Sequence, residues 1–78
     1  MPMWQYELQV PRDVVSSEEL AEYRSLAIAT WRTAAEASGG RPGEPEAILV
    51  EISPEAARPD PVTGEPACSA WRVLGPVD

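Results

Sequence analysis

The residue with the clearest capacity for chemistry is Pro2, which follows Met1. Methionine before a small residue is normally removed, and its removal would leave Pro2 as an amino-terminal secondary amine. A free α-amine has a pKa of about 7.7–8.0, and burial or nearby arginines lower such a pKa because both disfavour the cation. An amine tuned in this way can act as a general base near neutral pH. The alternative is that Pro2 only stiffens the start of a strand.

The residue types that are missing narrow the chemistry further. The sequence has no histidine, lysine, asparagine or phenylalanine, and its one cysteine is Cys68. Ser–His and Cys–His nucleophile pairs and Schiff-base lysines are therefore excluded. A single cysteine forms no intrachain disulfide and, without histidine, completes no zinc site. An enzyme of this composition would move protons with a carboxylate, a tyrosine, Cys68 or its amino terminus, and would need neither a metal nor an organic cofactor.

The other titratable residues have structural explanations. Cys68 is more typical of a small buried strand residue than of a nucleophile, because neither a histidine nor a helix amino terminus accompanies it. Tyr6 and Tyr23 lie on the expected apolar faces, which favours core packing. Glu18 and Glu19 fall in the first turn of the expected helix, where negative charge is favourable, and their spacing matches no metal motif.

Charge and size limit the partners of the chain. Six arginines against thirteen acidic residues give a net charge of −7, which disfavours nucleic acid and anionic membranes. No apolar run reaches the roughly 18 residues of a membrane span, and no signal-peptide pattern is present, so we expect a cytoplasmic protein. Residues 1–78 make one domain whose core is marginal in size. With no disulfide or zinc site available, we expect a homo-oligomer.

The first two elements have clear sequence signals. Trp4–Val10 alternates apolar and polar residues, which predicts a half-buried strand. Val15–Ser38 carries apolar residues at three- and four-residue steps, which predicts an amphipathic helix. Ser16 and Glu19 form a capping box at its start, and Gly39-Gly40 provides the left-handed backbone of a helix end.

Two further strands are predicted, over Ala47–Ser53 and Ala67–Leu74. The order strand, helix, strand, strand predicts an α+β fold in which one helix packs on a small mixed sheet. The first two strands would form a parallel pair through a right-handed crossover, and the last would return antiparallel or join the sheet of another chain. Pro54–Pro66 is unusually long for a loop without structure, so we expect it to be functional or to cross onto a neighbouring subunit.

This arrangement resembles the tautomerase superfamily, which includes 4-oxalocrotonate tautomerase and cis-3-chloroacrylic acid dehalogenase. The similarity covers roughly residues 1 to 55: Met1-Pro2-Met3-Trp4 opening a strand, then Arg12, a helix, a Gly/Pro turn and the strand Ala47–Ile52. The resemblance implies a trimeric or hexameric enzyme, without cofactor, that acts on a small keto or enol carboxylic acid.

The resemblance also implies roles for individual residues. Pro2 would be the catalytic base or acid, and Arg12, ten residues further on, would bind the substrate carboxylate. Several family members carry a second arginine in the strand after the helix, which this chain lacks. Arg72 is a candidate substitute for that arginine, and Trp71 is a candidate for the aromatic residue that the family often places after its second strand.

Strand geometry constrains how Pro2 and Arg12 can cooperate. Ten extended residues span about 33 Å, so one chain cannot bring the two together, and Arg12 would have to come from a neighbouring subunit. Two other functions remain open. One is a non-catalytic oligomeric module of the same general fold. The other is a small accessory protein whose proline-rich loop or sheet edge binds a protein partner by strand addition.

Overall fold

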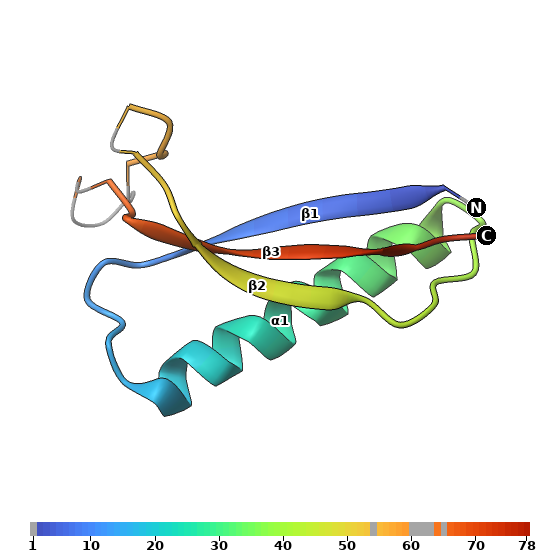
Figure 1. The fold of residues 1–78 in the computed structure, drawn as a ribbon, viewed down its shortest axis with the longest axis horizontal. Coiled ribbons are helices and arrows are strands. Elements are labelled where there is room, and N and C mark those ends of the chain that lie inside the picture. The colour runs from blue at the N-terminus through green and yellow to red at the C-terminus, as the bar shows by residue number, and fades with distance from the viewer. Residues whose placement is uncertain (1, 54, 60–63, 65) are drawn as a thin grey trace.

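In the computed structural model, one helix packs across one face of a three-stranded antiparallel sheet (Figure 1). The elements in chain order are β1 (Met3–Val10), α1 (Ser17–Ala37), β2 (Glu46–Glu51) and β3 (Ser69–Pro76). The structure describes residues 2–53, 55–59, 64 and 66–78. The predicted α+β class and the order strand, helix, strand, strand are confirmed. In this part of the chain, no helix has the length and apolar character needed to cross a membrane.

The order of strands in the sheet is β1-β3-β2, and β3 is antiparallel to both neighbours. The predicted parallel pair of the first two strands, and with it the mixed sheet, is therefore wrong. β1 and β2 run in the same direction, but β3 lies between them. The physical reason is burial. β3 contains Ala70 and Val73, which are both fully buried, and the central position gives a strand neighbours on both edges and so shields it most from water. Antiparallel pairing is also slightly more stable per residue than parallel pairing.

Both ends of α1 form as the sequence predicts. Ser16 is the N-cap, and its side-chain oxygen accepts a hydrogen bond of 3.1 Å from the backbone N–H of Glu19. At the other end, Gly39 has a φ of +86°, in the left-handed region. The N–H groups of Gly39 and Gly40 donate to carbonyls of the last helical turn, each at 3.0 Å. This is a Schellman motif, which satisfies the carbonyl groups that the end of a helix leaves free.

Trp31 is the centre of the core between α1 and the sheet. Its side chain is 1% exposed, and its indole N–H donates to the backbone carbonyl of Trp4 at 3.1 Å. The side chains buried with it are small, which lets the helix approach the sheet closely: Ala27, Ala35, Val73 and Val77. The apolar stripe predicted for the helix therefore faces the sheet at Ala27 and Trp31, but its last member is wrong: Ala34 is exposed and Ala35 is buried instead.

The sheet face opposite α1 carries large apolar side chains that remain exposed. The strand register places Met3, Ile48 and Leu74 on this open face, and they are 56%, 56% and 39% exposed. β2 is also exposed on its other side, where Leu49 is 41% exposed, because α1 packs mainly on β1 and β3. The edge strand β2 is thus the least covered part of the sheet.

Candidate functional site

Pro2 immediately precedes β1 and is exposed. Its carbonyl oxygen accepts a hydrogen bond of 3.0 Å from the backbone N–H of Val77, which fixes the residue at the end of the sheet where the two termini meet (Figure 1). Water therefore reaches the ring of Pro2 in a single protomer. The predicted removal of Met1 concerns a residue outside those that the structure describes.

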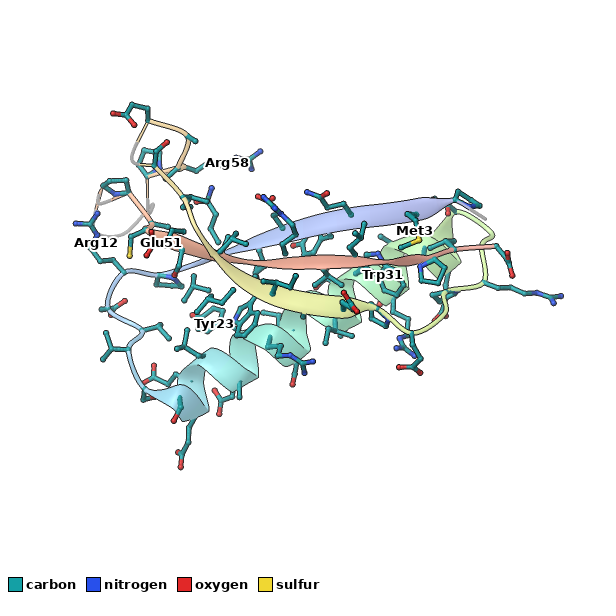
Figure 2. All side chains as sticks on the ribbon, viewed as in Figure 1. Met3, Arg12, Tyr23, Trp31, Glu51 and Arg58 are labelled. Carbon is teal, nitrogen blue, oxygen red and sulfur yellow. The ribbon has the colours of Figure 1, made fainter. Side chains whose placement is uncertain are left out.

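Arg12 lies at the far end of β1, in the turn that leads to α1, and is also exposed. Figure 2 shows Met3 and Arg12 at opposite ends of the molecule. The eight-residue strand that separates them is unbroken. One protomer therefore does not bring Pro2 and Arg12 together, and a site that uses both would need Arg12 of a second copy.

Arg72 and Trp71 are neighbours in β3 that face opposite sides of the sheet. Arg72 lies on the open face, where its Nε donates to a carboxylate oxygen of Glu7 at 2.9 Å. Trp71 lies on the helix side, and its indole N–H donates to the backbone carbonyl of Leu20 at 3.0 Å. Because the two side chains are on different faces, they do not line one site within a protomer.

The Glu7–Arg72 ion pair leaves Arg72 able to exchange its partner. The two side chains are 36% and 45% exposed, and pairs this exposed contribute about 0–1 kcal/mol. The guanidinium could therefore release Glu7 for an anionic ligand at little cost. Arg72 is five residues along β3 from Val77, the residue bonded to Pro2, which corresponds to about 17 Å.

Arg41 is the arginine whose backbone the fold brings to the Pro2 end of the molecule. Its N–H donates to the carbonyl of Asp78 at 2.8 Å, and the N–H of Asp78 donates back at 3.0 Å. A β-bridge between Pro42 and Val77 continues this pairing. Sequence reasoning missed Arg41 because the pairing joins segments more than thirty residues apart, and no local pattern marks it.

A shallow, open hollow of about 520 Å³ lies beside β2, lined by Leu49–Ile52, Cys68 and Ser69. Cys68 is exposed, so the expectation of a buried strand residue is wrong. It precedes β3, in the last residues of the connection from β2, rather than within the sheet. Across residues 2–53, 55–59, 64 and 66–78, no three cysteine or acidic side chains are grouped to hold a metal ion.

Only part of the long connection between β2 and β3 falls within the described residues. Of Pro54–Pro66, residues 54, 60–63 and 65 lie outside them. In the rest, the backbone N–H of Arg58 donates to the side-chain oxygen of Gln9 at 3.2 Å, and Pro59 forms a bridge with Pro66. This segment therefore contacts β1 of its own protomer.

Comparison with known proteins found no match: no family model fits the chain, and neither the curated proteins nor the solved structures include a significantly similar one. The class of protein that the structure defines is a two-layer α+β domain with an uncovered sheet face. The similarity to the tautomerase superfamily rests on the sequence pattern.

Proposed function

We propose that this protein acts by association rather than by catalysis, as a self-associating module whose working surface is its sheet. The observation that carries the proposal is the exposure of large apolar side chains on the sheet, Met3, Ile48, Leu49 and Leu74. Three of these side chains lie on the open face, with Leu49 on the other side of the edge strand β2, and exposed apolar patches on a small protein typically mark interaction sites. The four residues that the sequence singled out for chemistry, by contrast, are spread over both ends and both faces of the protomer.

The dimensions of the protomer support this proposal. Its accessible surface is 5331 Å², compared with about 4,650 Å² for a monomer of this mass. Its radius of gyration is 13.3 Å, compared with about 11.5 Å for a compact domain of this length.

We expect the full chain to exist in solution as a dimer or a higher oligomer at micromolar concentration. Sedimentation equilibrium, which gives the mass of the particle, would measure this against the 8.5 kDa of one chain. Added salt should strengthen the association, because each copy carries a charge of −7 and salt screens repulsion between like charges. A particle with the mass of one chain up to millimolar concentration would contradict the proposal.

The second candidate function is the cofactor-independent enzyme of the tautomerase type, acting in the cytoplasm. The observation that favours it is the end of the sheet where Pro2 is fixed by Val77 and the backbone of Arg41 pairs beside it. After removal of Met1, the amine of Pro2 would transfer a proton on a small keto or enol carboxylic acid. Paired charge-assisted hydrogen bonds from Arg41, or from Arg12 of another copy, would hold the carboxylate.

Substitution of Pro2 tests this second function. If the enzyme is correct, the intact mass lacks Met1, phenylenolpyruvate is turned over, and Pro2→Ala lowers the rate by about 10²–10⁴-fold, the usual contribution of a general base. Pro11→Ala is the matched control, since Pro11 is an internal residue at the other end of β1, and it should leave the rate unchanged. A retained Met1, or equal turnover by Pro2→Ala, would exclude the amine as the base.

A further inference from the structure

The central part of the outer edge of β2 lacks the features that normally keep a sheet edge unpaired. Among the described residues, β2 pairs with β3 on one side only. Its sequence Glu-Ala-Ile-Leu-Val-Glu has four consecutive apolar residues between two terminal glutamates, without proline, glycine or a basic residue. Its register with β3 is continuous, without a bulge. Natural proteins protect edges with charges, prolines or bulges, and unprotected apolar edges recruit another strand.

The other edge strand differs in these respects. β1 alternates polar residues along its length, Gln5, Glu7 and Gln9, and it lies between Pro2 and Pro11. The segment around Arg58 also contacts Gln9. β2, rather than β1, is therefore the edge strand that is open to pairing with a further strand.

The register shows which backbone groups of β2 face outward. The N–H of Ile52 donates to the carbonyl of Cys68 at 3.1 Å, at the position that continues the pairing of β2 with β3. Hydrogen bonds of an antiparallel ladder involve alternate residues of each strand. The even-numbered residues therefore bond to β3, and the N–H and C=O groups of Ala47, Leu49 and Glu51 point away from the sheet.

We propose that these outward groups pair with β2 of a second copy of the chain, antiparallel, with Leu49 on the twofold axis. Leu49 then opposes Leu49 of the second copy, Ile48 opposes Val50, and Ala47 opposes Glu51. In this register all three outward-facing residues of β2 bond to the partner. A shift of two residues in either direction leaves one of them without a partner.

The sequence of β2 favours β2 of a second copy as the strand that pairs with this edge. A twofold interface uses the same patch on both partners, and this strand is self-complementary. Apolar residues meet apolar residues at its centre, while Glu46 and Glu51 fall opposite Ile52 and Ala47. Like charges directly opposite each other destabilise a strand pair, and this register avoids them. The exposed side chain of Ile48 then packs beside Val50 of the second copy on the open face, and Leu49 packs beside Leu49 of the second copy on the helix side.

The result is a continuous six-stranded sheet in the order β1-β3-β2-β2-β3-β1. Because the twofold axis is perpendicular to the sheet, both copies of α1 lie on the same side, and the two open faces join into one. This inference rests on the proposed self-association and specifies its interface.

A disulfide placed on the axis tests the interface directly. Opposed residues of a hydrogen-bonded antiparallel pair have Cα atoms about 5.5 Å apart, within the roughly 4.4–6.8 Å that a disulfide spans. We expect Leu49→Cys, in a Cys68→Ser background, to form a covalent dimer under mild oxidation, seen by non-reducing electrophoresis. Gln5→Cys in the same background is the matched control on the outer edge of β1 and should remain uncrosslinked.

Proline on the axis provides the complementary test. The N–H of Leu49 takes no part in the ladder with β3, and proline is tolerated at such edge positions, so Leu49→Pro should fold but lose the dimer mass in sedimentation. Gln5→Pro, at the equivalent position of β1, should keep it, and circular dichroism would check that both variants fold.

The outcomes separate this interface from self-association in general. An axis disulfide together with a monomeric Leu49→Pro supports the β2 interface. An oligomer that forms no disulfide at position 49 and survives Leu49→Pro overturns the interface but keeps the proposed module. A native chain that is monomeric, including one that instead adds a foreign peptide strand at β2, overturns both.

Discussion

Trp31→Ala is expected to unfold most of the protein under native conditions. Truncation of a buried tryptophan costs about 3–5 kcal/mol, and a core of this size supplies only about 3–5 kcal/mol in total. The loss includes more than buried area, because the hydrogen bond from the indole N–H to the carbonyl of Trp4 is lost as well. Urea titration followed by far-ultraviolet circular dichroism would measure the change.

Leu26→Ala is the matched control for this prediction. Leu26 is another large apolar residue of the same helix, but it is 53% exposed, so its truncation should cost about 1 kcal/mol or less. Trp31→Phe should fall between the two, since it keeps an aromatic ring but loses the hydrogen bond and part of the volume. If Trp31→Ala and Leu26→Ala unfolded at similar urea concentrations, the position assigned to Trp31 would be wrong.

Gly75→Ala is expected to destabilise the protein by about 1–3 kcal/mol, the usual cost of overpacking a core. A Cβ atom on Gly75 would lie 2.7 Å from Cζ2 and 2.8 Å from Cη2 of Trp31, and 2.9 Å from the Cα of Pro45. Neither neighbour can move away easily. The indole is anchored by its bond to Trp4, and the Pro45 contact is with backbone. Urea titration again provides the measurement.

Two further variants isolate the steric cause. A Cβ atom on Gly39 would have no neighbour within 4 Å, but Gly39 has a φ of +86°. Gly39→Ala should therefore lower the stability by about 1–2 kcal/mol through backbone strain alone. The double variant Gly75→Ala, Trp31→Phe should lose less free energy of unfolding than the two single variants lose together, because the smaller ring makes room for the new methyl group. Simple additivity would show that the two residues do not compete for the same space.

Part of the candidate site could be predicted from the residue types in the sequence. The absence of histidine and lysine reduced the possible chemistry to a few groups, with Pro2 first among them. Strand length alone placed Pro2 and Arg12 apart, and the structure has them at opposite ends of β1. The faces of Arg72 and Trp71 also follow from strand alternation. The placement of the Arg41 backbone at the Pro2 end of the sheet does not, because it depends on a pairing between distant segments.

The sequence by itself determined the local features of this protein. The capping residue Ser16, the left-handed Gly39 and the alternation in the strands each act within a few residues, so they can be recognised without knowledge of the rest of the chain. The tertiary structure alone decided that β3 separates β1 from β2 and that β2 forms an exposed edge. The physical reason is that strand order is set by competition for burial against one helix, and this competition involves all the strands together.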